Sequence, residues 1–321
     1  MYKNPLFGNG GVWMLKYIIK RLLAGVLTMV VLITVAFFMM HAMPGGPFSP
    51  SEEKNVPVEV LERIAASYGL DQPVWKQYLT YWSNLLHGDL GISYKTVGTV
   101  NEKISGHFPY SAQVGGLAVL FSLLIGIPMG LIAALHRGKA ADFITLALAT
   151  IGISVPVFVL SLLLSYLFSS KLNWLPTYGL DSWLCYILPV ICLSFNPIAY
   201  IARQTRSSML EALEQDYVRT ARAKGVSELM VVVKHALKNA LTPVITYLGP
   251  LVAGLLTGSF VVESRFAIPG LGYYFVRSIS DRDYTMIMGI VIFFGLFVVI
   301  CNLVSDILLA IVDPRVKLAN D

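Results

Sequence analysis

Charged residues are scarce in this chain. Asp, Glu, Lys and Arg make up 13% of its 321 residues, whereas soluble globular domains carry about 25%. The deficit argues against a soluble enzyme and against an intrinsically disordered chain. The net charge of +5 does not indicate a nucleic-acid-binding protein either. Such a protein gathers its basic residues on one soluble face, and here they fall mostly between long apolar runs.

Cysteines and common cofactor motifs are also rare in the sequence. The three cysteines, Cys185, Cys192 and Cys301, all lie inside apolar runs and lack metal-ligand spacing. We interpret them as buried thiols without a disulfide or zinc role. No P-loop with Gly-Lys-Ser/Thr is present, so the chain is not expected to bind ATP in that way. We expect no metal and no cofactor on this chain, and no covalent chemistry.

Long apolar runs are abundant in the sequence. Hydrophobic residues make up 56% of the chain, and a bilayer core needs about 20 of them in one helix. The first run is longer than a signal-peptide core and lacks a small-residue cleavage site, so we expect it to stay in place as a span. The sequence therefore predicts an all-α membrane protein with six spans, at residues 22–43, 111–135, 143–168, 184–202, 240–262 and 286–312.

The basic residues predict the orientation of these spans. Fifteen of the 24 Lys and Arg residues lie in four segments on one side of the predicted bundle, at 1–21, 136–142, 203–239 and 313–321. Cytoplasmic loops carry the excess of positive charge in membrane proteins. Both the N-terminal segment and the C-terminal tail are therefore predicted to be cytoplasmic, and residues 44–108 to be extracytoplasmic.

Few ionisable residues interrupt the spans. Asp306 lies in the last span, on one helical face with Asn302 and Ser305. An acid inside a membrane is a functional candidate, but a polar contact that faces the bundle interior is the simpler interpretation. Ion-coupled carriers are expected to show relays of acids and histidines, or ion sites at broken helices. A single Asp gives such a secondary transporter weak support, and it is kept as the alternative of a different class.

The cytoplasmic loop at 203–239 is the most informative stretch. Apolar residues at helical spacing predict a helix over 205–224, and Gly225 follows it as a C-cap. Ser227 can cap a second helix that has Glu228 in its first turn and an apolar stripe behind it. This amphipathic helix either covers the floor of the bundle or docks into a groove of a cytoplasmic partner.

At this loop the chain resembles a known family. Residues 219–225, RTARAKG, resemble the EAA loop of bacterial ABC importer permeases, with Arg219 and Lys238 standing where the general pattern has Glu and Pro. Both departures agree with the peptide/nickel branch, which DYVR at 216–219 and HALKNALTP at 235–243 fit closely. Further matching stretches lie at 69–73, 88–93, 258–263, 268–272 and 283–284. The resemblance covers residues 15–317 and is closest to the B subunit of oligopeptide permeases.

The resemblance implies a fold, a function and a set of partners. The fold is the type-I ABC importer permease, with its core at 109–312. The chain would be a permease subunit, not an enzyme, that forms half of a pathway for oligopeptides in the bacterial cell membrane. Its partners would be a homologous second permease, two cytoplasmic ATPase subunits that bind ATP and Mg, and an extracytoplasmic peptide-binding protein. Dipeptides, nickel and glutathione are alternative substrates within the branch, and a membrane scaffold without transport is a disfavoured third class.

The same resemblance suggests where the functional residues lie. The coupling surface toward an ATPase would comprise Thr220, Ala221, Arg222, Lys224, Gly225, Ser227, Glu228 and His235. Candidate pathway or gate residues are Glu263, Pro269, Gly270, Gly272 and Asp306; a packed loop is the alternative for 265–272. The outer segment is predicted to hold helices at 56–68 and 74–86, which form either a docking platform for the binding protein or a lid on the membrane surface.

Overall fold

A computed structural model describes residues 10–42, 63, 66–67 and 69–312. The predicted helix at 56–68, the first nine residues and the tail at 313–321 therefore lie largely or wholly outside the described residues. The chain divides into two compact units, one formed by residues 1–107 and 274–297 and the other by 108–273 and 298–321.

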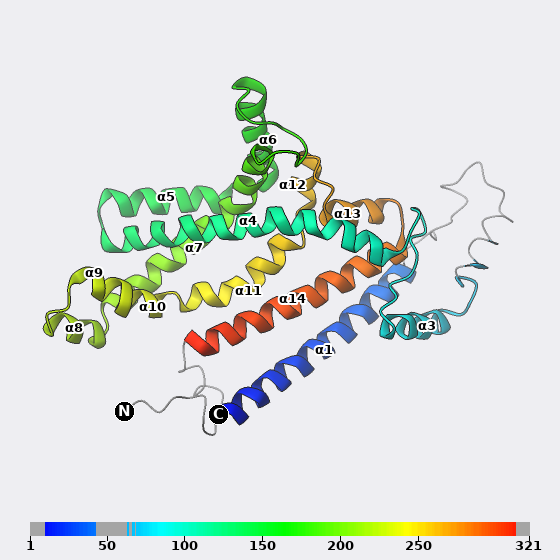
Figure 1. Ribbon diagram of the computed structural model, residues 1–321, viewed down its shortest axis with the longest axis horizontal. Helices are drawn as coiled ribbons and strands as arrows, with labels where there is room; N and C mark the ends of the chain where they lie inside the picture. Colours follow the sequence, from blue (N-terminus) through cyan, green and yellow to red (C-terminus); the bar gives the residue numbers. More distant parts are fainter. Residues whose placement is uncertain (1–9, 43–62, 64–65, 68, 313–321) are drawn as a thin grey trace. The chain divides into compact units, whose positions relative to one another are not determined.

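The regular structure of the described residues is helical, apart from an isolated bridge between Ile92 and Thr99 (Figure 1). In chain order the helices are α1 (Gly10–Ala42), α3 (Val74–Leu86), α4 (Val100–Leu135), α5 (Ala140–Ser154), α6 (Val157–Leu164), the π-helical η1 (Ser165–Lys171), α7 (Leu184–Leu213), α8 (Asp216–Ala223), α9 (Glu228–Met230), the π-helical η2 (Val231–Ala236), α10 (Leu237–Ala240), α11 (Thr242–Leu256), α12 (Phe260–Arg265), α13 (Leu271–Ser280) and α14 (Tyr284–Val312). Helix α3 has the predicted bounds.

The predicted membrane fold is confirmed. Among the described residues, five helical stretches are long and apolar enough to cross a membrane, and a bent pair makes up to six. The bent pair corrects the prediction of one continuous span at 143–168. Helices α5 and α6 meet at 103°, because Pro156 has no N–H to donate and its ring disfavours a helical conformation at the preceding residue. Val155 is accordingly extended, with φ −79° and ψ 118°.

A second correction concerns the predicted helix at 205–224. Helix α7 ends at Leu213 and α8 begins at Asp216, with Gln215 in an extended conformation. The helical apolar pattern continues across the break between the two helices because the apolar residues of both helices pack in one hydrophobic cluster. Met209 of α7 and Val218 of α8 are both members of it. The pattern thus identified the buried residues correctly and missed the bend between them.

The first unit has an aromatic core. Ile33, Phe37 and Met40 of α1 are buried with Met288 of α14, and side chains of α3 pack against them. The ring centroids of Phe37 and His41 are 4.2 Å apart, and His41 also hydrogen-bonds the Gln77 side chain at 3.0 Å. These contacts attach α3 to the C-terminal end of α1.

The second unit relies on small residues where its helices cross. A Cβ added to Gly152 of α5 would lie 2.7 Å from Cβ of Ala199 in α7. Gly126 of α4 lies equally close to α7, since an added Cβ would be 2.9 Å from Cβ of Ile201. Close backbone approach at small residues is the usual way in which membrane helices associate. The arrangement holds α7 between its neighbours and fixes the direction in which its last turns leave the bundle.

Candidate functional site

The predicted coupling residues fall on a helical hairpin at the end of α7. It consists of α8, a turn at 224–227 and a return helix formed by α9, η2 and α10 (Figure 1). We call residues 216–240 the coupling hairpin. Its inner face forms one cluster with the end of α7, and the buried members are Ala134, Met209, Ala212, Val218, Ala221, Val231, Val232, Ala236 and Ala240. The hairpin is therefore a packed extension of the bundle.

The turn of the hairpin favours glycine. Gly225 has φ +75°, a left-handed conformation that costs a side-chain-bearing residue about 1–2 kcal/mol. Its N–H donates to Arg222 O at 2.9 Å, and Val226 N–H donates to Ala221 O at 3.3 Å. This pattern of backward hydrogen bonds ends a helix at a left-handed residue. The predicted C-cap is confirmed.

An ion pair between Arg222 and Glu228, which the sequence did not predict, closes the turn. Arg222 donates from Nη2 to Glu228 Oε1 at 2.6 Å and from Nε to Oε2 at 3.1 Å. The pair raises the pKa of Arg222 and lowers the pKa of Glu228. Ser227 stands at the N-cap position but makes no side-chain capping hydrogen bond, so its predicted capping is wrong. A six-residue separation across a reversed turn has no helical signature, and only the complementary charges hinted at the pair.

The other predicted coupling residues separate into buried and exposed groups. Ala221 is buried in the hairpin core, and the hydroxyl of Thr220 donates to Asp216 O at 2.9 Å within its own helix. His235 is half-buried, and Lys224 is exposed.

Beside the turn lie three exposed apolar side chains. Leu229 is 76% exposed, and Met230 and Val233 are about half exposed. The inner stripe of the helix is already satisfied by the hairpin core, so this second apolar surface has no burial within the described residues of the chain. An exposed apolar patch with charged residues beside it is typical of a protein interaction site.

The predicted gate residues converge on one buried carboxylate. Glu263 of α12 is only 4% exposed. It accepts hydrogen bonds from Ser111 Oγ and from Tyr273 N, both at 2.7 Å, while Ser111 Oγ accepts from Leu271 N at 2.8 Å. A Cβ added to Gly272 would lie 3.1 Å from Glu263 Oε2. The carboxylate therefore holds the 258–273 segment against α4.

The remaining pathway candidates are placed as follows. Gly270 lies against the Glu263 carboxylate, and Pro269 belongs to the same turn, which is closed by Gly270 N donating to Ile268 O at 2.8 Å. Asp306 is half-buried on α14. Its neighbour Ser305 donates to Ile245 O of α11 at 2.7 Å. Phe266, Ile268 and Leu271 of the 265–272 loop are buried, and both the gate and the packed loop stay predictions.

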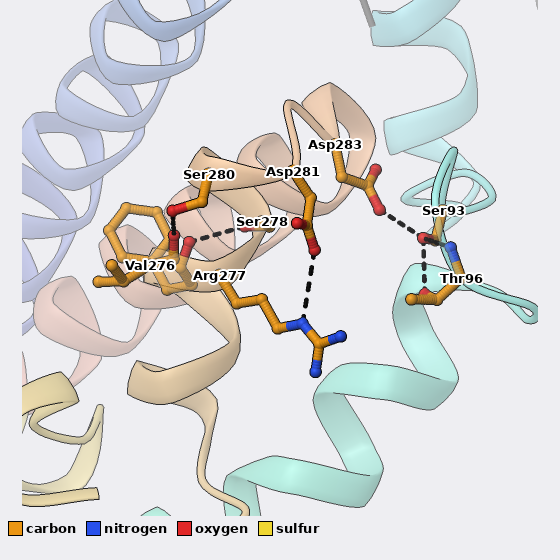
Figure 2. A network of polar contacts seen from close by, with 9 residues as sticks. Ser93, Thr96, Val276, Arg277, Ser278, Ser280, Asp281 and Asp283 are labelled. Carbon is orange, nitrogen blue, oxygen red and sulfur yellow. Dashed lines mark hydrogen bonds and ion pairs between the residues drawn. The ribbon is translucent and has the colours of Figure 1, made fainter. Parts of the chain in front are cut away.

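A second buried carboxylate organises the first unit and was seen in the sequence only as part of a motif. Asp283, just before α14, accepts hydrogen bonds from Ser93 Oγ and, at 3.1 Å, from Tyr94 N. Ser93 Oγ also lies 2.7 Å from Thr96 Oγ1. Figure 2 draws the contacts of Ser93 with Asp283 and Thr96. Asp283 Oδ1 accepts from Met286 N at 3.2 Å, in the first turn of α14. One side chain thus caps a span and fixes the loop at 88–99.

The described residues thus combine apolar spans with a glycine-turned helical hairpin at the end of α7. Residues 126–318 match the family of the binding-protein-dependent transport system inner membrane component, and residues 14–115 match the N-terminal family of such membrane components. The chain belongs to the binding-protein-dependent transport permease family.

Characterised relatives agree along almost the whole length. The dipeptide transport system permease protein DppB of Bacillus subtilis is 44% identical over 306 residues, which is 95% of this chain and 99% of that protein. The oligopeptide transport system permease proteins OppB of Haemophilus influenzae and Escherichia coli K12 are 41% and 40% identical over 307 residues, 95% of this chain and 100% of theirs.

A solved structure shows the same fold. An inward-facing conformation of the MetNI methionine ABC transporter aligns with a TM-score of 0.53 at 18% identity, covering 65% of this chain and 96% of that one. Together with the family match, this confirms the predicted type-I importer permease fold. The chain is a membrane-embedded transport permease subunit.

Proposed function

We propose that this chain forms one half of the membrane pathway of an ATP-driven peptide importer. Oligopeptides are the proposed substrate, and a homologous second permease is the proposed other half. ATP and Mg bind cytoplasmic ATPase subunits, and an extracytoplasmic binding protein delivers the peptide. Both termini lie in the cytoplasm, in keeping with the distribution of Lys and Arg.

The exposed apolar surface of the coupling hairpin carries this proposal. Leu229, Met230 and Val233 are exposed although the hairpin core behind them is complete. An amphipathic helix that presents apolar side chains at one-turn spacing is suited to a groove of a protein partner. The charged pair Arg222–Glu228 lies beside them and can set the orientation of docking, as rim charges do at interfaces.

The names of the relatives support the substrate class. Two describe oligopeptide transport, and one describes dipeptide transport at 44% identity. Dipeptides are therefore kept as the second candidate substrate. Both candidates share the peptide backbone, and neither requires an ionisable residue at a fixed position in the spans.

The proposal is tested by deleting the chromosomal copy and measuring uptake of labelled di-, tri- and pentapeptides by whole cells. We expect loss of uptake of the longer peptides and its recovery when the wild-type chain is supplied. Loss confined to the dipeptide would assign the chain to dipeptide import. Unchanged uptake of all three peptides would contradict peptide import.

A further inference from the structure

Close to the coupling hairpin, α5 and α7 are joined by an ion pair between a buried Asp142 and a partly buried Arg206, whose side chain is 21% exposed. The side chain of Asp142, in the first turn of α5, is 4% exposed. Its carboxylate accepts a hydrogen bond from Arg206 Nε and another, at 2.8 Å, from Arg206 Nη2. Gly138 N, in the turn between α4 and α5, donates to the same carboxylate at 3.0 Å. Both carboxylate oxygens are thus engaged by the guanidinium of α7.

The same level of α7 is also in contact with α4. A Cβ added to Gly130 of α4 would lie 2.7 Å from Cβ of Thr205 and 3.1 Å from the backbone N of Arg206. Thr205 is fully buried. Three helices are therefore fixed to one another around Arg206, by a bidentate pair on one side and by backbone contact on the other.

One turn further along, α7 enters the core of the coupling hairpin. Met209 and Ala212 are buried there with Val218 and Ala221 of α8 and Val231 of η2. Arg206 thus lies about one turn before the residues of α7 that pack in the hairpin core. The last turns of α7 therefore connect the hairpin core to α5, whereas α4 also contacts that core directly through Ala134.

We propose that Asp142 and Arg206 are positioning residues that transmit movement of the coupling hairpin through α7 to α5. The proposal rests on the proposed function, because it assumes that a partner moves the hairpin. A bidentate Arg–carboxylate pair fixes both distance and orientation, whereas apolar contacts allow helices to slide. Burial of such a pair is a weak source of stability, since apolar replacements are often neutral or stabilising. A role in transmission accounts for an ion pair at this place better than stability does.

The experiment measures peptide accumulated and ATP hydrolysed by the whole transporter in proteoliposomes, for the wild type and three variants. Asp142→Asn removes the charge. The double variant Asp142→Leu with Arg206→Met replaces the pair by apolar side chains and keeps the site filled. Arg137→Ala is the matched control, because it removes an exposed pair with Glu214 at 3.2 Å near the same end of α7.

For both pair variants we expect peptide transported per ATP to fall about tenfold, within the usual range of coupling free energies. The double variant, which leaves no unpaired charge, should keep the normal thermal stability of the complex. Arg137→Ala should keep the wild-type ratio. A wild-type ratio in both pair variants would overturn the proposal. So would a parallel loss of uptake, hydrolysis and thermal stability in the double variant, since that result defines a merely structural pair. If the wild type accumulates no peptide, the proposed function fails instead.

Discussion

At the scale of single residues, local interactions or backbone conformation explain the residue type at three positions of this permease. Gly225 has a left-handed backbone conformation that favours glycine. The carboxylate of Glu263 accepts hydrogen bonds from buried donors, and the carboxylate of Asp142 pairs with the guanidinium of Arg206. The sequence alone suggested the first, because a glycine that follows a helical pattern is a strong C-cap signal. It also marked Glu263, but not its partner Ser111, which lies 152 positions away. Pairing at such a separation leaves no local pattern.

Substitutions at Gly225 should test the effect of backbone strain alone, because the site has room for a side chain. A Cβ at this position would meet nothing within 4 Å, so the cost comes from the left-handed conformation alone, about 1–2 kcal/mol. We expect Gly225→Val to lower peptide transported per ATP while membrane insertion stays intact. Gly225→Asn is the matched control, because Asn tolerates this conformation better. Equal ratios in wild type, Asn and Val variants would refute the importance of the turn.

Replacing Glu263 should destabilise the second unit. Glu263→Ala leaves the Ser111 hydroxyl and the Tyr273 amide without their acceptor, and an unsatisfied buried group costs about 1–3 kcal/mol. Thermal unfolding of the purified protein in detergent should therefore begin at lower temperature. The exposed neighbour Ser264 supplies the control, Ser264→Ala, for which no change is expected. A Glu263→Ala variant as stable as Ser264→Ala would show that the carboxylate does not hold the loop.

At the scale of elements, periodicity located the helices, and proline and chain reversals decided how they break. Helix α3 was predicted with its observed bounds, since Pro73 precedes it and its apolar positions keep helical spacing. The bend at Pro156 was missed because proline is common in membrane helices and a sequence does not distinguish a mild kink from a turn of 103°. The reversal at Gln215 was missed because both sides bury the same cluster.

The exposed face of the hairpin gives a prediction at this scale. Leu229→Asp should uncouple ATP hydrolysis from uptake, because a charge buried at an apolar interface is costly unless it is paired. The variant should be expressed normally, since Leu229 is 76% exposed and outside the hairpin core. Asn239→Asp, at an exposed position on the same return helix, is the control and should couple normally. Co-purification of the ATPase subunits measures the docking directly; retention equal to wild type would exclude this face.

The Arg222–Glu228 pair gives the turn a pH dependence. Its Glu228 has a pKa below the ordinary value, so the stabilisation is present at neutral pH and is lost as the pH falls through the lowered pKa. The effect is small because both side chains are well exposed. Amide hydrogen exchange at Gly225 and Val226, corrected for intrinsic rates, should speed up on acidification in the wild type and not in Glu228→Gln. Identical pH profiles would show that the pair does not hold the turn.

At the scale of the whole molecule, the chain is a permease subunit whose spans lack the relay of acids and histidines that an ion-coupled carrier uses. Among the described residues of the second unit, the buried acids are Asp142 and Glu263, and both are engaged in hydrogen bonds within that unit. The proposed source of energy is therefore the ATPase partners, and the coupling hairpin is proposed to respond to them.

The most direct test is peptide uptake by proteoliposomes that contain this permease and its partner permease, with and without the ATPase subunits. With the ATPases and the binding protein present, ATP should drive accumulation of peptide against its gradient. Without the ATPases, a proton or sodium gradient of either direction should drive none. Uphill accumulation powered by such a gradient alone would contradict the account.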